Sequence, residues 1–415
     1  MKKIRLNKQL ILALLVGLLI CMGLPSCEEY PNAYKHTDGI PEVLYVRLPN
    51  AAKADSLLDG AFLGNTICIV GNNLRSVREL YFNDQQAVLN TSLITDHTLF
   101  VTVPNGIPVD VTNKMYLTAF NDQIVSYDFK TKVPGPSVNS ISCEYAVEGG
   151  EASLYGDFFL DDPITPLEII FPGNLPVTEF ISIEKNRIRF IVPQGAAKGY
   201  INVNTLYGTG RSKFQYKDDR GMILDWDKLT GAGWRDGNNR LFTEGGISGK
   251  YIRFKGDLTG AWSEDDFSFN LWSCQTSRPK PPPPSDFFDA TKLDEFLFKF
   301  EVNVLKPWTR DAMQICFHSW DTQNTNGYYS SGSHARALWI PWRDAKTYMT
   351  DGWVTIIIPM KDFRFSATGA VLEPNAAGNY GGLSMFIWNN GGVSGGTNCN
   401  TELWIDNIRV VPVDK

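Results

Sequence analysis

Short runs of alternating apolar and polar residues, bounded by Gly, Pro, Asn and Asp, fill most of this 415-residue chain. Such period-two runs predict half-buried strands, because successive side chains of a strand point to opposite faces. Helical periodicity is scarce. A chain of this length suffices for roughly two to four ordinary domains. The sequence therefore predicts an all-β protein built from several domains.

Two stretches in the first half of the chain resemble each other. In each, a strand leads into a glycine turn, a second strand follows, and a third strand ends in Val-Pro-x-Gly. The turn glycines Gly71 and Gly156 are 85 residues apart, and the prolines Pro104 and Pro193 are 89 apart. That spacing is the size of a small β-sandwich, so the repeat predicts tandem domains rather than solenoid units.

These motifs resemble the IPT/TIG family of immunoglobulin-like domains. The matching features are a Gly-x-x-Leu/Phe turn after the first strand, at Gly71 and Gly156, and the Val-Pro strand ending. The resemblance implies two Ig-like β-sandwiches, joined at Val133-Pro134-Gly135-Pro136, where proline fixes φ and limits swing. Neither copy offers a catalytic constellation or an aromatic platform, which favours a role as rigid spacers.

The N-terminus has the pattern of a lipoprotein signal. Four basic residues precede the apolar run Leu10–Ile20, which is shorter than the ~20 residues that a spanning helix needs. Leu24-Pro25-Ser26-Cys27 then resembles a bacterial lipobox with Cys27 as the acylated residue; ordinary cleavage with a structural Cys27 is the alternative. Glu28 and Glu29 resemble the surface-export signal of Bacteroidota lipoproteins, or form a solvated linker. We expect a lipid anchor that faces the cell exterior.

The charge of the mature chain points to neutral ligands. Removal of residues 1–26 leaves 35 basic against 45 acidic side chains, which argues against nucleic acid and acidic polysaccharides. Beyond Cys27 the cysteines are odd in number and lack Cys-x-x-Cys spacing, so neither a disulfide framework nor a zinc site is predicted. No cofactor is predicted, and no ligand cluster assigns a structural calcium.

All eleven tryptophans lie between Trp226 and Trp404. Indole fills cores and forms binding platforms alike, so the function is sought in this half of the chain. The proline run 279–284 must be extended and is expected in a surface loop. Three strand-like stretches resemble the opening, middle and closing strands of carbohydrate-binding jelly rolls: Ile223–Trp226, Gly352–Phe363 and Leu403–Val410.

The order of these segments resembles the surface glycan-binding lipoproteins of Bacteroidota polysaccharide utilisation systems, especially the type whose C-terminal domain binds xyloglucan. The resemblance implies capture of a neutral polysaccharide, such as xyloglucan or mixed-linkage glucan, at the outer membrane. It also implies delivery to surface hydrolases and to a TonB-dependent importer of the SusC/SusD type. The predicted divisions are a signal peptide at 1–26, an acidic tether at 27–39, IPT/TIG-like domains at 40–133 and 134–217, and a jelly-roll glycan-binding domain at 218–415.

Strand parity separates core aromatics from surface aromatics. Between residues 296 and 304 the even positions are apolar, so Phe296, Phe298 and Phe300 are expected in the core. Ile315 and Phe317 are expected to point inward in the next strand.

The opposite face of that next strand is predicted to bind the ligand. It would carry Gln314, His318 and Trp320, and if Leu338 and Ile340 face inward, Trp339 faces outward. A pyranose ring stacks its apolar face on an indole for about 1–3 kcal/mol. The predicted platform is Trp320, Trp339 and Trp342, with Trp308, Tyr328 and Tyr329 as neighbours, and with Gln314, His318, Asn324 and Arg343 as hydrogen-bonding groups. For each aromatic, packing in the core is the alternative.

The remaining tryptophans favour structural roles. Trp353 and Trp404 lie within the strand motifs quoted above, and Trp226 alternates with apolar neighbours. We expect all three to pack rather than to bind a ligand.

Two other functions remain open. A jelly-roll glycoside hydrolase on an Ig-like stalk would need two carboxylates about 5–10 Å apart. Glu295 and Glu301 share strand parity, but six residues separate them by roughly 20 Å. A surface adhesin would instead bind proteins through the Ig-like domains, and it predicts exposed apolar patches on residues 40–217.

Overall fold

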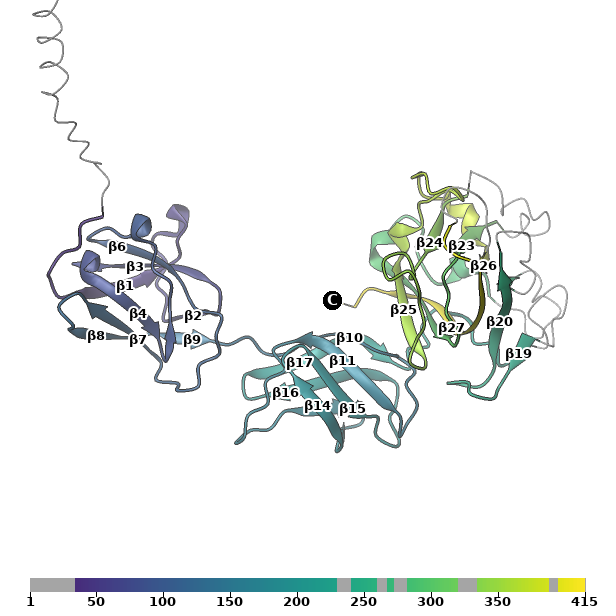
Figure 1. Cartoon of the computed structure of the whole chain (residues 1–415), viewed down its shortest axis with the longest axis horizontal. Coiled ribbons are helices and arrows are strands. Elements are labelled where there is room, and N and C mark those ends of the chain that lie inside the picture. Colours follow the sequence, from purple (N-terminus) through teal and green to yellow (C-terminus); the bar gives the residue numbers. More distant parts are fainter. Residues whose placement is uncertain are drawn as a thin grey trace, which may run out of the picture. The chain divides into compact units, whose positions relative to one another are not determined.

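The computed structural model describes residues 34–229, 240–259, 267–271, 282–319, 334–387 and 395–414. These residues form strands and short 3-10 turns (Figure 1), so the all-β prediction is confirmed. The chain divides into two compact units, one that ends at Pro134 and one that begins at Gly135. The 3-10 turns are Ala51–Lys53, Leu74–Ser76, Thr91–Leu93, Pro284–Asp286, Leu293–Glu295, Met360–Asp362 and Ala377–Tyr380. In the described part of the chain, no helix has the length and apolarity that a membrane crossing requires.

The first unit is an Ig-like sandwich, called here the first Ig-like domain. One sheet has the order β1-β3-β6, another has the order β5-β4-β7-β8, and β2 runs parallel to β9. A single apolar cluster, which includes Ile69, Phe82 and Leu117, lies between the sheets. The strands are β1 (Glu42–Arg47), β2 (Gly60–Phe62), β3 (Thr66–Asn72), β4 (Val77–Phe82), β5 (Gln85–Gln86), β6 (Thr98–Thr102), β7 (Lys114–Ala119), β8 (Ile124–Asp128) and β9 (Lys130–Lys132).

The second unit starts with another Ig-like sandwich, the second Ig-like domain. Its eight strands follow the order β13-β12-β16-β17-β10-β11-β15-β14, and the parallel pair β10 and β17 joins the two layers. The strands are β10 (Ser137–Ile141), β11 (Glu151–Asp157), β12 (Glu168–Phe171), β13 (Leu175–Pro176), β14 (Phe180–Glu184), β15 (Arg187–Ile191), β16 (Gly199–Thr205) and β17 (Gly208–Tyr216).

The repeated turn glycine is required for the same steric reason in both domains. In the first, the backbone carbonyl of Glu42 occupies the place where a Cβ on Gly71 would lie. In the second, the carbonyl of Ser137 does the same at Gly156. Each first strand carries a bulge opposite its glycine, between Val43 and Tyr45 and between 138 and 140. The glycine therefore lets two backbones meet closely at a bulge.

The rest of the second unit is a two-sheet sandwich, called here the C-terminal sandwich. One sheet has the order β19-β20-β27-β22-β25, with β18 also paired to β27, and the other has the order β21-β26-β23-β24. The strands of the larger sheet are β18 (Met222–Leu224), β19 (Leu241–Phe242), β20 (Tyr251–Leu258), β22 (Phe296–Val304), β25 (Val354–Pro359) and β27 (Cys399–Pro412). Those of the smaller sheet are β21 (Ser268–Asn270), β23 (Met313–His318), β24 (Arg336–Trp339) and β26 (Gly382–Ile387).

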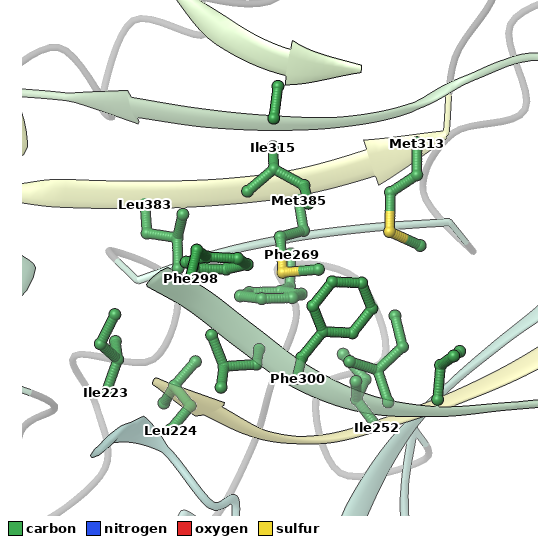
Figure 2. Close-up of a cluster of buried hydrophobic side chains, with 14 of the residues drawn as sticks. Ile223, Leu224, Ile252, Phe269, Phe298, Phe300, Met313, Ile315, Leu383 and Met385 are labelled. Atoms are coloured by element: carbon green, nitrogen blue, oxygen red, sulfur yellow. The ribbon is translucent and has the colours of Figure 1, made fainter. Parts of the chain in front are cut away.

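The core of this sandwich follows the predicted parity. Phe298 and Phe300 from β22 meet Ile315 from β23 between the sheets (Figure 2), and all three are fully buried. Phe317 is buried in the same cluster, while Phe296 is partly buried against it. The inward positions predicted for β22 and β23 are confirmed.

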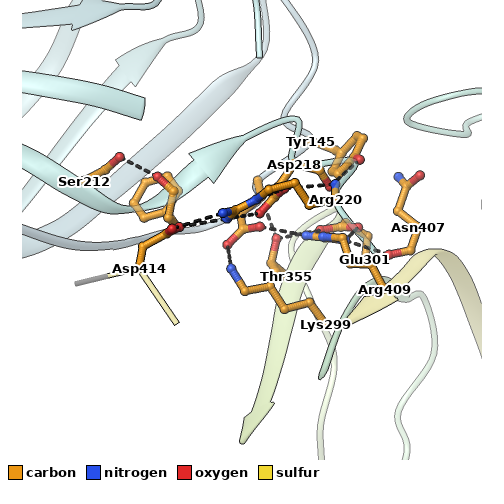
Figure 3. A network of polar contacts seen from close by, with 12 residues as sticks. Tyr145, Ser212, Asp218, Arg220, Lys299, Glu301, Thr355, Asn407, Arg409 and Asp414 are labelled. Carbon is orange, nitrogen blue, oxygen red and sulfur yellow. Dashed lines mark hydrogen bonds and ion pairs between the residues drawn. The ribbon is translucent and has the colours of Figure 1, made fainter. Parts of the chain in front are cut away.

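A buried ionic network joins the second Ig-like domain to the C-terminal sandwich (Figure 3). Glu144, in the loop between β10 and β11, accepts hydrogen bonds from Lys299 Nζ at 2.6 Å and Arg409 Nη2 at 2.7 Å. Arg409 also pairs with Glu301, whose carboxylate accepts a further bond from the Thr355 hydroxyl. Because all four charged side chains are at most 2 % exposed, each depends on its partners to offset its desolvation.

A second ionic contact closes the same junction near the end of the chain. Arg220 donates to Asp218, which is buried, and to Asp414 at 2.8 Å. Asp414 also accepts a bond from the hydroxyl of Tyr200, on β16. The last described residues are thus bonded to the second Ig-like domain.

Candidate functional site

An open groove of about 650 Å³ lies at one side of the C-terminal sandwich. It is bordered by β24 and β25, which are the edge strands of the two sheets. The residues that line it are Ala337, Leu338, Trp339, Ile357, Ile358, Pro359, Lys361, Asp362, Arg364 and Phe365. The groove thus has an apolar floor and a charged rim.

Trp339 is the largest side chain of the groove, and three aromatic rings hold its indole. Phe300, Trp308 and Tyr348 contact it edge-on, with ring centroids 5.5, 5.3 and 5.7 Å away. The side chain is only partly buried. A packed indole that keeps part of its surface accessible loses little conformational freedom when a flat ligand stacks on it.

The polar rim comes from the segment that follows β25. Lys361 and Asp362 lie in the 3-10 turn Met360–Asp362, and Arg364 follows directly. Lys361 and Arg364 are exposed, and Asp362 is half-buried. Phe365 is fixed because its backbone exchanges hydrogen bonds with Arg336 of β24. Such groups can donate to and accept from sugar hydroxyls along one side of the groove.

Two of the predicted platform residues are in the core. Trp308 is fully buried, and its indole N–H donates to the Arg310 carbonyl. Trp342 is 8 % exposed and donates to the Asp311 carbonyl at 2.9 Å. The prediction that these residues stack on a ligand is wrong, because each ring packs inside the sandwich and its one donor is satisfied internally.

Trp339 faces the opposite way from the prediction. The antiparallel register pairs it with Met313 and pairs Ala337 with Ile315. Residues directly opposite each other share a face, so Trp339 lies on the core side, where the aromatic contacts hold it. It reaches solvent because β24 is an edge strand. That Trp339 binds a ligand remains a prediction, and the groove is the place where a ligand would reach it.

Gln314 and His318 share the outer face of the smaller sheet, but both are fully buried. Gln314 accepts a bond from Arg336 at 2.7 Å, and His318 Nε2 lies 2.8 Å from the Ser384 hydroxyl. Burial lowers the pKa of His318 to about 4, so the imidazole is neutral at pH 7. The prediction that these two side chains meet a ligand at the surface is therefore wrong.

The other predicted residues divide into two groups. Trp320, Asn324, Tyr328 and Tyr329 lie outside the described residues. Arg343 is exposed and stays a prediction.

Sequence reasoning missed the rim residues of the groove. The stretch 352–363 resembles a strand and turn of jelly rolls, and that resemblance points to no binding role for Lys361 and Asp362 in the turn.

Trp353 and Trp404 form a separate cluster on the outer face of the larger sheet. Trp404 stacks on Tyr251 at 4.7 Å, and its other neighbours include Gly245, where a Cβ would lie 2.9 Å from the indole. Trp353 donates to the Gly245 carbonyl. Trp226 is fully buried. The packing role predicted for Trp226 is confirmed, whereas Trp353 and Trp404 are partly exposed and their structural role stays a prediction.

One acidic residue and three thiols outside the groove are buried. Burial raises the pKa of Glu301, which lies within the ionic network and is inaccessible to a ligand. Across the described ranges, no group of three or more His, Cys, Asp or Glu side chains could hold a metal ion. Cys68, Cys143 and Cys316 are buried free thiols, and burial raises the pKa of each.

In the chain, two Ig-like domains precede a jelly-roll sandwich that has a groove with an aromatic floor. This organisation is that of a multidomain binding protein. Residues 216–412 match the family model described as the surface glycan-binding protein B xyloglucan binding domain. The chain is also 32 % identical to the surface glycan-binding protein PbSGBP-B from Prevotella bryantii. That match covers 90 % of this chain and 99 % of that structure, with a TM-score of 0.72. The chain belongs to the surface glycan-binding proteins.

A second relative carries the IPT/TIG name. An IPT/TIG domain-containing protein of Bacteroides ovatus is 27 % identical over 153 residues. The match covers 35 % of this chain and 30 % of that protein. This match supports the IPT/TIG resemblance, while the bounds of the individual domains stay a prediction.

Proposed function

We propose that this protein captures a neutral β-linked glucan, such as xyloglucan or mixed-linkage glucan, in the groove between β24 and β25. The observation that carries the proposal is the half-buried Trp339, held edge-on by three rings inside the region that matches a xyloglucan-binding domain. The apolar face of a pyranose would stack on this indole while Lys361, Asp362 and Arg364 bond its hydroxyls.

The surroundings of the groove favour binding over hydrolysis. Among its described lining residues, Asp362 is the one carboxylic acid, whereas glycosidases of the common type use a pair. Glu301 is enclosed by Arg409 and Thr355. We therefore propose a non-catalytic role.

We further propose that the protein is displayed on the outer membrane. Cys27 would carry the lipid anchor, residues 27–39 would form a tether, and the two Ig-like domains would act as spacers before the C-terminal sandwich. The captured glucan would pass to surface hydrolases and to a SusC/SusD-type importer that depends on TonB. The lipobox-like sequence and the surface proteins among the relatives support this arrangement.

A second candidate function, protein adhesion through the Ig-like domains, has one observation in its favour. Several large apolar side chains are highly exposed there, among them Val88 at 89 %, Val109 at 91 % and Ile164 at 92 %. Single exposed apolar residues are normal on soluble proteins, so glycan capture remains the leading proposal.

Affinity electrophoresis of the mature chain in gels that contain neutral polysaccharides tests the proposal. We expect retardation by xyloglucan or mixed-linkage glucan, and about a tenfold weaker apparent affinity in Trp339→Ala and Arg364→Ala. Trp404→Ala is the matched control, since this half-buried indole of the same sandwich lies outside the groove. No retardation by any glucan would contradict glycan capture. Release of reducing sugar would favour a hydrolase, and unchanged retardation in both groove variants would exclude the groove.

A further inference from the structure

The first Ig-like domain has a hollow of about 500 Å³ on the outer face of its sheet β5-β4-β7-β8. Its lining residues are Arg78, Glu79, Tyr81, Asn83, Tyr116, Thr118, Asp122 and Ile124. A volume of this size falls in the range of small-molecule sites, about 300–1,000 Å³.

Two tyrosines form the floor of the hollow. Tyr81 of β4 and Tyr116 of β7 are directly opposite in the antiparallel register. Their chain neighbours Leu80, Phe82 and Met115 are fully buried in the core, so the tyrosines point outward. Both are half-buried, so part of each phenol is accessible to solvent. Cross-strand pairs have Cβ atoms about 5 Å apart, so both phenols leave the sheet from neighbouring points of the same face.

Asn83 adds an unsatisfied donor at the same place. It is 5 % exposed, and its Oδ1 accepts bonds from the backbone of Thr112 and Asn113. Its amide nitrogen is buried and has no partner among the residues that the structure describes. A buried N–H without a partner costs free energy, so native structures rarely keep one unless a water or ligand supplies the acceptor.

The charges around the hollow are paired. Arg78 bonds Asp122 at 2.8 Å and lies 3.6 Å from Glu79. Farther along the same face, Lys114 bonds Asp128 at 2.7 Å. A hollow with an aromatic floor and internally compensated charge favours a neutral ligand that has both apolar and hydroxyl surfaces.

The equivalent place in the second Ig-like domain lacks these features. There Ile170 of β12 stands opposite Asn202 of β16, and Pro172 follows the strand where Asn83 follows β4. The tyrosine pair is thus a property of one copy of the repeat and is not required by the fold.

We propose that this hollow is a second contact site for a neutral oligosaccharide chain, which stacks on Tyr81 and Tyr116. The inference rests on the proposed function, because it assigns to the first Ig-like domain the same class of ligand as the groove. Two weak sites on one chain bind a polymer more tightly than either does alone, since the second contact forms at a high effective concentration. The site therefore contributes mainly to binding of long glucans.

The test compares the full mature chain with Tyr81→Ala and Tyr116→Ala, alone and combined, on polymeric xyloglucan and on a xyloglucan oligosaccharide. We expect the double variant to bind the polymer about three- to tenfold more weakly, and the oligosaccharide stoichiometry to fall from two sites to one by calorimetry. Tyr155→Ala is the matched control, a 39 % exposed tyrosine on β11 of the second Ig-like domain. Ile124→Lys, at a 67 % exposed position, obstructs the hollow without touching the core and should show the same loss.

The outcomes separate this inference from the function on which it rests. If wild type binds xyloglucan and neither the tyrosine variants nor Ile124→Lys differ from it, the hollow is not a glycan site and the inference is wrong. If wild type binds no glucan at all, glycan capture itself fails. A loss that Tyr155→Ala shares would also overturn the inference, since it would not be specific to the hollow.

Discussion

The two Ig-like domains share a repeat but expose different chemistry. Both keep a glycine where the first strand passes close, at Gly71 and at Gly156. The second domain places Glu144 against the outer face of the larger sheet of the C-terminal sandwich, where it meets Lys299 and Arg409. In the first domain, the described ion pairs Arg78–Asp122, Lys114–Asp128 and Lys132–Asp59 lie on the surface.

This difference shows that the same Ig-like fold can form a buried contact in one copy and leave an open hollow in the other. Side chains that fix the strands are alike in both copies, because the bulge and the close backbone approach are geometric requirements. Side chains on the outer faces are free to differ. In the second domain a loop residue, Glu144, enters a buried joint, and in the first domain the outer face leaves a hollow with Tyr81 and Tyr116 at its floor.

The largest expected effect comes from breaking the buried joint. Arg409→Met removes the described cationic partner of Glu301 and one of the two that Glu144 has, so the buried Glu301 carboxylate keeps the Thr355 hydroxyl but no positive charge. We expect the second unit to lose about 3–5 kcal/mol of its free energy of unfolding, measured by urea denaturation. Lys114→Met, which breaks an exposed pair in the first Ig-like domain, should leave the free energy of unfolding nearly unchanged, because water screens that pair. Equal losses for the two variants would contradict the comparison.

The next, smaller effect is the dependence of the free energy of unfolding of the second unit on pH. His318 is fully buried in the second unit, whereas His36 and His97 in the first are exposed. Because burial lowers the folded-state pKa of His318 to about 4 from an ordinary value of 6.5, the unfolded chain binds a proton first as pH falls. We expect this residue to contribute a loss of about 2–3 kcal/mol in the second unit between pH 6.5 and 4, and no change above pH 7.

His318→Gln isolates that contribution, because glutamine does not titrate and can still bond the Ser384 hydroxyl. Urea denaturation at a series of pH values should show a shallower acid slope for the variant than for wild type. An identical slope in both proteins would mean that His318 takes up its proton without cost in the folded state.

Much of the fold could be predicted from patterns within single strands. Parity placed Phe298, Phe300 and Ile315 in the core, and the repeat identified the tandem domains. Parity also indicated that Lys299 and Glu301 face away from that core. It could not show that the same face is buried, because the cover comes from Glu144, more than 150 residues earlier in the chain.

The site was harder to predict because a groove depends on which strands are edges and how they pair. The face of Trp339 follows from its register with Met313, which no single strand reveals. Trp308 and Trp342 each follow a proline, a position typical of a strand end, yet each indole bonds a nearby carbonyl inside the sandwich. The sequence around an aromatic residue does not show whether the ring packs in the core or binds a ligand.

Hydrogen exchange of the mature chain, with and without a saturating xyloglucan oligosaccharide, tests the central claim most directly. We expect slower exchange in the segments that border the groove, residues 336–340 and 354–365, while exchange in the loop around Glu144 is unchanged. Peptides around Trp404 serve as an internal control in the same sandwich. Binding of the oligosaccharide with protection confined to other segments would contradict the groove as the site of capture.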